Sequence, residues 1–296
     1  MGNANAVRNG IKSEAEREVE SEFEREIKSE LERKIKSGIN SVSPTTALSV
    51  NLNKIALIRN SRAGNYPDVV AHGQVCLAAG ADGLTVHPRP DQRHIRPYDV
   101  YDLAELLKDN HRAEFNIEGN PFAEKIGDFP GFIQLVLDTK PQQCTLVPDS
   151  NDQLTSDHGF DLKKSGERLK PILAQLKDAG VRTSLFMDPD LEQIELAKQL
   201  GADRIELYTG PYAEAYKHQD PHFEQLFQRY YAAAEYAAKI GLGVNAGHDL
   251  NLENFARFRT VPQLLEVSIG HALTVDAIAM GLSEAVRAYK QLCIAH

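Results

Sequence analysis

The chain has 296 residues, 42% hydrophobic and 25% charged, which is the composition of an ordinary globular protein with a sizeable core. Its formal net charge of −9 and isoelectric point near 5.6 argue against a general nucleic-acid or anionic-membrane binder, which would present a basic face. The three cysteines lack metal-ligand spacing, and no apolar run suits a membrane span or signal peptide, so a reducing, cytoplasmic location is expected.

The N-terminal segment differs from everything after it. From Ile11 to Ile39 an apolar residue returns at every fourth position, with Glu, Lys, Arg and Ser between. This pattern predicts a helix, but a spacing of four exceeds the helical period of about 3.6, so the apolar stripe winds around the helix. We therefore expect residues 1–45 to form a charged helical extension, either a solvated appendage or an oligomerisation or partner helix. Residues 46–296 would form the catalytic domain.

Segments rich in apolar residues then alternate with helical patterns up to the C-terminus. The predicted strands are Leu48–Leu52, Gly83–His87, Glu114–Glu118, Cys144–Val147, Arg182–Met187, Arg204–Tyr208, Leu242–Ala246 and Leu265–Ile269. The predicted helices are Asp68–Ala79, Pro97–Lys108, Phe129–Thr139, Leu162–Ala179, Leu191–Leu200, Phe223–Ile240, Leu252–Arg257 and Val275–Leu292. This alternation favours an α/β fold with a closed (β/α)8 (TIM) barrel, whose usual length of about 250 residues also fits. An open doubly wound sheet is the alternative.

Glycines stand where such a barrel turns from a helix into the next strand. Gly80, Gly180 and Gly201 each follow a predicted helix, and we expect them to end it in the left-handed conformation.

The densest group of ionisable side chains follows the second predicted strand. The apolar run stops at His87, and Pro88 and Pro90 prevent a helix in the loop that follows. This loop carries Arg89, Arg93 and His94. Because active sites of (β/α)8 barrels gather at the carboxyl ends of the strands, the loop predicts a site for an anionic substrate. A histidine with a purely structural role is the alternative for any one of these residues.

Most of the other predicted strands also end in polar residues. They are Asn51, Asn53 and Lys54, with Arg59 and Arg62 beyond, after the first strand; Glu118 in the third; Glu206 and Tyr208 in the sixth; Asn245 and His248 in the seventh; and His271 after the eighth. In a barrel these ends converge on one pocket, where several histidines and glutamates indicate acid–base catalysis. Pairing of a buried glutamate with a cation is the structural alternative.

The last two strands end in short glycine-containing turns. These are Asn245-Ala-Gly247-His-Asp and Ser268-Ile-Gly270-His271-Ala. Barrels commonly bind phosphate at these loops through backbone N–H groups and a helix N-terminus, so a phosphate site is expected, with a simple tight turn as the alternative. The segment 148–159 after the fourth strand is rich in Asp, Ser, Asn and Thr and is a candidate lid.

Several common chemistries are disfavoured. The first strand has Asn51-Leu-Asn53 where metal-dependent barrel hydrolases have His-x-His, and no lysine ends a middle strand as a Schiff-base residue would. The chain also shows neither a nucleophile elbow nor a nucleotide-binding Gly-rich loop. We expect no required metal, and the family resemblance described next implies no organic cofactor.

At these residues the chain resembles the pyridoxine 5′-phosphate synthase family, from about residue 46 to the C-terminus. The shared segments include Asn51-Leu-Asn-Lys with Arg59-Asn-Ser-Arg62, Thr-Val-His87-x-Arg89, Asn-Ile-Glu118, Leu-Val-Pro148, Thr209-Gly210, Asn-Ala-Gly-His248 and Ile-Gly-His271. The resemblance implies condensation of 3-amino-2-oxopropyl phosphate with 1-deoxy-D-xylulose 5-phosphate to pyridoxine 5′-phosphate, phosphate and water. It also implies a homo-oligomer, such as an octamer, with phosphorylated small-molecule substrates and no nucleic-acid or membrane partner.

The resemblance also implies roles for individual residues. His87 and Glu118 would accept protons, His248 would donate one, and Glu206 would stabilise charge in the transition state. The aminoketone phosphate would contact Asn51, Arg62, Gly270 and His271, and the pentulose phosphate would contact Arg89, His94 and Thr155. Asn53, Lys54 and Asp249 occupy further substrate-binding positions, where many family members have Asp, His and Gly. Asp249 would suit a phosphate only if its side chain pointed away and its backbone N–H made the contact.

Two other functions remain open from the residues alone. A barrel isomerase or aldolase acting on one sugar phosphate would need a single anion site. A scaffold whose N-terminal helix recruits a partner would depend on residues 1–40 and not on His87.

Overall fold

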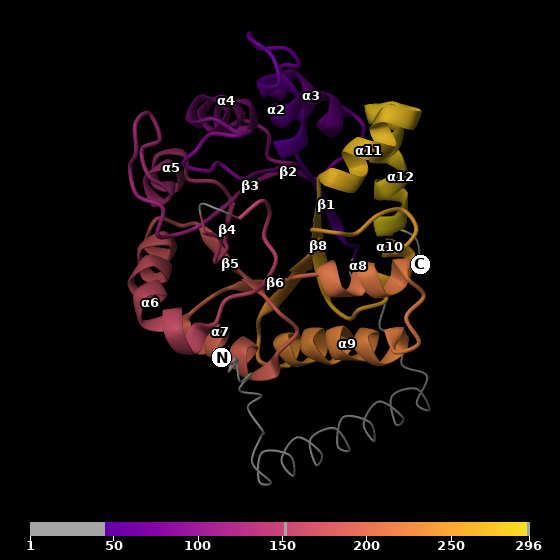
Figure 1. The fold of residues 1–296 in the computed structure, drawn as a ribbon. Coiled ribbons are helices and arrows are strands. Elements are labelled where there is room, and N and C mark those ends of the chain that lie inside the picture. The colour runs from indigo at the N-terminus through magenta and orange to yellow at the C-terminus, as the bar shows by residue number, and fades with distance from the viewer. Residues whose placement is uncertain (1–44, 151–152, 295–296) are drawn as a thin grey trace, which may run out of the picture. The chain divides into compact units, whose positions relative to one another are not determined.

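The computed structural model describes residues 45–150 and 153–294, which form a closed barrel of eight parallel strands (Figure 1). The strands are β1 (Ala47–Asn51), β2 (Gly83–Val86), β3 (Glu114–Gly119), β4 (Gln143–Leu146), β5 (Arg182–Met187), β6 (Arg204–Leu207), β7 (Gly243–Ala246) and β8 (Leu264–Ile269). Each strand pairs with the next one in the chain, and β8 pairs with β1, from Ala47 opposite Glu266 to Val50 opposite Ile269. The predicted TIM barrel is therefore confirmed, and this closure rules out the open sheet.

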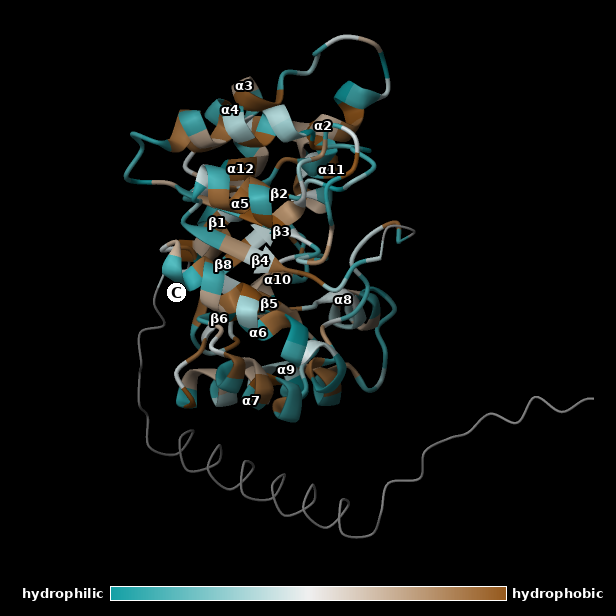
Figure 2. Ribbon diagram, turned by 90° about the vertical axis from the view of Figure 1, so that its left-hand side faces the viewer, coloured by the Kyte–Doolittle hydropathy of each residue, from teal (hydrophilic) through white to brown (hydrophobic). Residues whose placement is uncertain are grey.

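Helices form a ring outside the barrel (Figure 1). They are α2 (Asn53–Asn60), α3 (Val69–Ala78), α4 (Pro97–Leu107), α5 (Phe132–Thr139), α6 (Leu162–Asp178), α7 (Leu191–Leu200), α8 (Gly210–Lys217), α9 (Phe223–Lys239), α10 (Phe255–Phe258), α11 (His271–Met280) and α12 (Leu282–Ile294). In Figure 2 the outer helices carry both hydrophilic and hydrophobic residues, as amphipathic helices packed on a sheet do.

The main hydrophobic core lies between the sheet and these helices. Strand residues such as Leu84, Ile117, Leu185 and Val267 are fully buried. Burying one such side chain contributes about 1.5–3 kcal/mol relative to leaving it exposed. This layer explains why the strands appear in the sequence as apolar runs.

The interior of the barrel is polar, unlike the Val, Ile and Leu layers that fill most TIM barrels. The hydroxyls of Ser49 and Thr85 lie 2.7 Å apart, and the Gln143 side chain on β4 donates to Glu266 on β8 at 3.2 Å. Strands β4 and β8 are not neighbours, so this bond crosses the barrel. Because buried polar groups are costly unless paired, such bonds are what allow a polar column to lie beneath the strand ends.

The helix-to-strand turns agree with the expectations from sequence. Gly80, Gly180 and Gly201 have φ angles of 108°, 79° and 94°, the left-handed region in which a side chain would be strained. The helix starts use side-chain caps where the sequence offers them. Asp68 accepts the N–H of Ala71 at 2.8 Å at the start of α3.

The predicted strand ends are correct to within one residue, but some helices were wrong. The helix predicted over Val275–Leu292 is two helices, α11 and α12, separated at Gly281, whose φ is 87°. The helix predicted from Phe129 begins only at Phe132, because Gly131 takes a φ of 101°. Helices α2 and α8 were not predicted. The last predicted helix before β8 shortens to the single turn α10.

The predicted N-terminal helix lies outside the described residues, so the division into residues 1–45 and 46–296 stays a prediction. Within 45–150 and 153–294, no helix combines the length and apolar composition needed to cross a membrane.

Candidate active site

The four predicted catalytic residues lie at the carboxyl ends of four different strands. His87 directly follows β2, Glu118 lies in β3, Glu206 lies in β6, and His248 follows β7 closely. His87, Glu118 and Glu206 are buried, with exposed fractions of 6%, 8% and 4%. The charge of His248 acts on both His87 and Glu118, and the charge of Glu118 acts on Glu206. The structure therefore brings these four side chains together in one electrostatically coupled cluster.

Glu118 has the properties of a proton acceptor that works near neutral pH. Its carboxylate accepts hydrogen bonds from Asn51 at 3.3 Å, from Asn116 at 3.4 Å and from Ser268 at 3.3 Å. Burial raises its pKa to about 7, although the nearby charge of His248 and the bond from Ser268 oppose the rise. A carboxyl with such a pKa can both take up and release a proton during catalysis.

The surroundings of Glu206 also favour the neutral form of its carboxyl group. Burial raises its pKa well above the usual carboxyl range, and the charges of Glu118 and Glu266 add to this rise. This shift favours the protonated form of Glu206, which can donate a hydrogen bond to negative charge that develops in a transition state.

His87 is held as a neutral imidazole. Its backbone N–H donates to the Asn53 side chain at 2.8 Å, and its Nε2 lies 3.8 Å from a carboxylate oxygen of Asp149. Burial and the positive charge of Arg89 lower its pKa well below the usual histidine range, with smaller effects from other cationic neighbours. A neutral ring is the form that can accept a proton.

Arg89 is buried in an ion pair with Asp149, a residue that the sequence reasoning missed. The Ser156 hydroxyl also donates to this carboxylate, at 2.9 Å. A signal for Asp149 existed, because it lies only three residues after the end of β4, but in the segment after this strand only Thr155 was assigned to the site. An anionic substrate that binds Arg89 would therefore compete with a carboxylate that is already in place.

His94 is oriented by its own loop. Its Nδ1 lies 2.9 Å from the N–H of Ile95 and accepts from it, which leaves the proton on Nε2. Burial, together with Arg89 and Lys54, lowers its pKa to about 3. The buried Arg59, which pairs with Asp99, donates to the backbone oxygen of His94 at 3.0 Å. Arg59 therefore holds the backbone of the His94 loop in place, a structural role that its sequence position did not reveal.

His248 connects two loops. Its Nδ1 lies 2.6 Å from the carboxylate of Asp249, and its Nε2 lies 2.8 Å from the hydroxyl of Thr155. Burial by itself would lower its pKa, but the hydrogen bond and charge of Asp249 outweigh that effect, so the pKa is raised. A raised pKa favours the protonated imidazole, which is the form that can donate a proton.

The predicted phosphate end lies where β8 leads into α11. Gly270 is the N-cap of α11, and a Cβ at this position would lie 2.9 Å from the Cβ of Asn51. Glycine at position 270 therefore allows the chain after β8 to pass close to the end of β1. His271 is exposed in the first turn of α11, where free backbone N–H groups favour an anion.

Not every predicted residue joins the cluster. Arg62 is exposed between α2 and α3, and the hydrogen bonds of the described residues do not join its guanidinium to the other site residues. The backbone N–H of Asp249, expected to contact phosphate, donates instead to the Thr209 hydroxyl at 3.2 Å.

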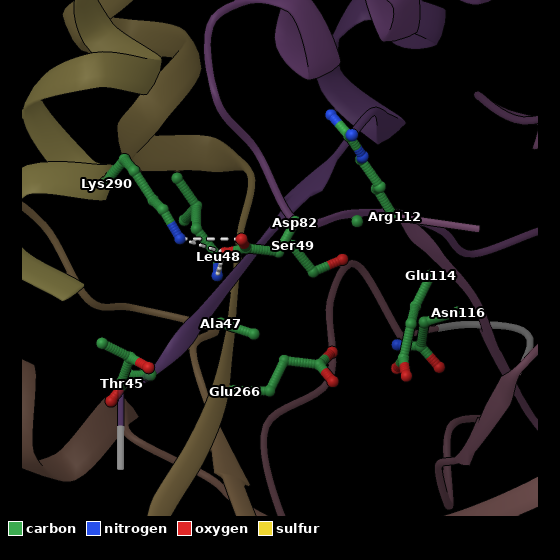
Figure 3. A pocket seen from close by; sticks show the side chains of 12 residues that line it. Thr45, Ala47, Leu48, Ser49, Asp82, Arg112, Glu114, Asn116, Glu266 and Lys290 are labelled. Carbon is green, nitrogen blue, oxygen red and sulfur yellow. Dashed lines mark hydrogen bonds and ion pairs between the residues drawn. The ribbon is translucent and has the colours of Figure 1, made fainter. Parts of the chain in front are cut away.

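A cavity of about 250 Å³ lies at the amino-terminal end of the barrel, opposite the predicted catalytic residues (Figure 3). It is lined by the amino-terminal residues of several strands, including Ala47, Gly83 and Glu114. Its charged groups are largely paired: Lys290 contacts Asp82 at 2.7 Å, and Arg182 pairs with Glu114. Because barrel chemistry occurs at the carboxyl ends of the strands, this cavity is not the catalytic site.

Fold and site together define a (β/α)8-barrel protein with a cluster of histidine and glutamate side chains at the carboxyl ends of its strands. Residues 48–295 match the family described as pyridoxal phosphate biosynthesis protein PdxJ. The chain belongs to this family.

Relatives of this chain agree with this assignment, and solved structures share its fold. Pyridoxine 5′-phosphate synthase of Xanthomonas campestris pv. campestris (strain B100) is 55% identical over 246 residues, which cover 83% of this chain and 95% of that protein. The synthase of Bacteroides fragilis (strain YCH46) is 51% identical, with 83% and 98% covered. The tryptophan synthase alpha chain from Legionella pneumophila subsp. pneumophila aligns with a TM-score of 0.57 at 14% identity, covering 90% of this chain and 96% of that one. That likeness reflects the shared barrel fold alone.

Proposed function

We propose that the chain catalyses the synthesis of pyridoxine 5′-phosphate from 3-amino-2-oxopropyl phosphate and 1-deoxy-D-xylulose 5-phosphate, releasing phosphate and water. The observation that carries the proposal is the coupled cluster of Glu118, His87, His248 and Glu206, in a chain that is 51–55% identical to named synthases. The compartment we propose is the cytoplasm.

The chemistry needs groups of this kind. The amine of one substrate must attack the ketone of the other and water must leave. A proton must then be removed beside the imine, phosphate must depart, and the ring must close. In our proposal Glu118 and His87 accept protons in these steps, and His248 donates one to a departing oxygen. Glu206, as a neutral acid, stabilises negative charge on an oxygen in the transition state.

Two phosphorylated substrates need two anion sites, and the proposal uses two sides of the barrel mouth. The pentulose phosphate binds on the side of Arg89, His94 and Thr155, with Asn53 and Lys54 beside it. The aminoketone phosphate binds on the side of Asn51, Gly270 and His271. The proposal places Arg62 on this second side as well, which requires the segment between α2 and α3 to close over the substrate.

The direct test is mass-spectrometric detection of pyridoxine 5′-phosphate after the purified protein is mixed with both substrates. Product must require both compounds. An isomerase or aldolase would instead turn over one sugar phosphate alone, and a scaffold would turn over neither.

We expect chelation to leave activity unchanged. Within 45–150 and 153–294, no three His, Cys, Asp or Glu side chains are arranged to hold a metal ion, and the proposed steps are proton transfers that His and Glu can perform. Turnover should therefore be equal before and after dialysis against EDTA. Loss of turnover that one added metal restores would contradict this prediction.

We also expect a protein that begins at Thr46 to fold and to keep its activity. Strand β1 begins at Ala47, the Thr46 hydroxyl donates to the backbone of Leu264 at 2.9 Å, and every candidate site residue lies beyond this point. Its melting temperature should stay within a few degrees of that of the full chain. Circular dichroism measures folding and the melting temperature, and a turnover assay measures activity. Light scattering tests the homo-oligomer that we also propose. Aggregation or inactivity would mean that residues 1–45 are needed.

A further inference from the structure

Three side chains form a line that joins the β7 loop to the segment after β4. Asp249 Oδ2 lies 2.6 Å from His248 Nδ1, and His248 Nε2 lies 2.8 Å from Thr155 Oγ1. The resemblance to the synthase family accounts for His248 and Thr155, but it places glycine in many members where this chain has Asp249. The carboxylate is therefore a feature of this chain that the proposed reaction has not yet used.

The backbone of Asp249 is held at both ends. Its N–H donates to the Thr209 hydroxyl at 3.2 Å, and its carbonyl oxygen accepts from the Asn254 side chain at 3.2 Å. The following residue, Leu250, donates to the backbone of Gly247 at 2.7 Å. These bonds form a tight turn that leaves the Asp249 carboxylate pointing back at the preceding histidine.

The imidazole itself is confined by aromatic rings. The centroids of the Phe186 and Tyr208 rings lie 6.1 Å and 5.8 Å from that of His248, both in edge-on orientations. The ring therefore has little room to rotate, and the contact with Asp249 determines which nitrogen faces the site.

A carboxylate at Nδ1 can only accept, so Nδ1 carries a proton in both charge states of the ring. The catalytically useful proton is then the one on Nε2, which faces Thr155 and the barrel mouth. The other charged or titratable groups that act on His248 are Glu118 from β3, Asp149 after β4 and His87 after β2. Within the described residues, none of these three groups makes a hydrogen bond to the ring. Asp249 is the charged group that does.

We propose that Asp249 is a positioning residue that fixes the tautomer and direction of His248 and so presents its Nε2 proton to the substrate. The proposal rests on the proposed function, since it assigns His248 as the proton donor. In it, the hydroxyl of Thr155 occupies the place where a substrate oxygen binds, so substrate replaces this contact while Asp249 keeps the ring in the same orientation.

The test is Asp249→Asn, followed by the pH dependence of kcat/KM. The donor must be protonated, so activity is present below the pKa of His248 and lost as the pH rises through it. Removing the negative charge lowers that pKa, and the alkaline limb of the profile should move down by about one pH unit. The rate should therefore fall about tenfold above both pKa values and much less on the acid side. Asp249→Glu keeps the charge, so its alkaline limb should lie close to that of the unchanged protein.

A second measurement does not need turnover. Protein labelled with 13C in its histidines gives a titration curve for His248, assigned by the loss of its signal in His248→Asn. Asp249→Asn should lower this pKa by about one unit. Asp249→Ala, which also removes the acceptor at Nδ1, should in addition change the tautomer signature of the neutral ring. Because the titration is made without substrate, it decides the proposal even if the protein fails to make pyridoxine 5′-phosphate.

The matched control is Glu214→Gln. Glu214 pairs with His218 at 2.9 Å on the exposed surface of α8, so this change also removes a carboxylate from a histidine but lies outside the site. It should leave both the pH profile and the His248 titration unaltered. A loss in Asp249→Asn that is equal at every pH, with an unchanged His248 titration, would overturn the proposal.

Discussion

Glu118→Gln should lower kcat by about a hundredfold or more while the barrel remains folded. Glutamine keeps the shape of the side chain, and its amide oxygen can still accept from Asn116 and Ser268, but it cannot accept a proton. Because burial raises the pKa of Glu118 to about 7, an acceptor role also predicts that kcat/KM of the unchanged protein rises with pH through that region. That acid limb should be absent from whatever activity the variant retains.

Stability should move in the opposite direction from activity. The folded-state pKa of Glu118 lies above its unfolded value, so its stabilising contribution is present at low pH and lost as the pH rises through about 7. A neutral glutamine avoids the cost of burying a charge above that pH. The melting temperature of Glu118→Gln should therefore equal or exceed that of the unchanged protein at pH 8.

The matched control for this variant is Glu266→Gln. Glu266 is also buried in the barrel, 5% exposed, and its pKa is also raised by burial, but it lies at the amino-terminal end of the barrel, where it accepts from Gln143. We expect its kcat to stay within a few-fold of normal. Equal losses in the two variants would show that the barrel interior tolerates no neutral substitute, and the acid–base assignment of Glu118 would then fail.

His87→Asn is the second change for which we expect a loss of about a hundredfold or more in kcat. Asparagine keeps the backbone bond to Asn53 and a polar group near Asp149, so the loop should retain its path. What disappears is a neutral ring nitrogen that can take up a proton. Single-turnover measurements would show whether the chemical step itself is slowed.

A surface histidine provides the comparison for this variant. His218 on α8 has a side chain that is 67% exposed, and His218→Asn should leave turnover within experimental error of normal. If His87→Asn turns over at a near-normal rate with a normal circular dichroism spectrum, His87 does not act as a proton acceptor and serves only to shape the loop.

The sequence by itself determined the order of the barrel and which polar residues stand at the ends of its strands. Its strands were visible because their outward-facing residues are apolar, and their ends were visible because His87, Glu118, Glu206 and His248 interrupt those runs. In a parallel barrel all such ends lie on one face, so their proximity followed from topology alone. The family resemblance then supplied roles that position could not, such as donor versus acceptor.

The tertiary structure decided what depends on contacts between distant residues. Closure of β8 onto β1, the hydrogen bond from Gln143 to Glu266 across the barrel, and the pairing of Arg89 with Asp149 leave no local pattern in the chain. The charge states followed the same rule. By sequence Glu118 and Glu206 are ordinary carboxyl groups, yet burial raises the pKa of Glu118 to about 7 and that of Glu206 well above the usual carboxyl range. A pKa depends on the surroundings of a group in three dimensions, and sequence spacing does not specify them.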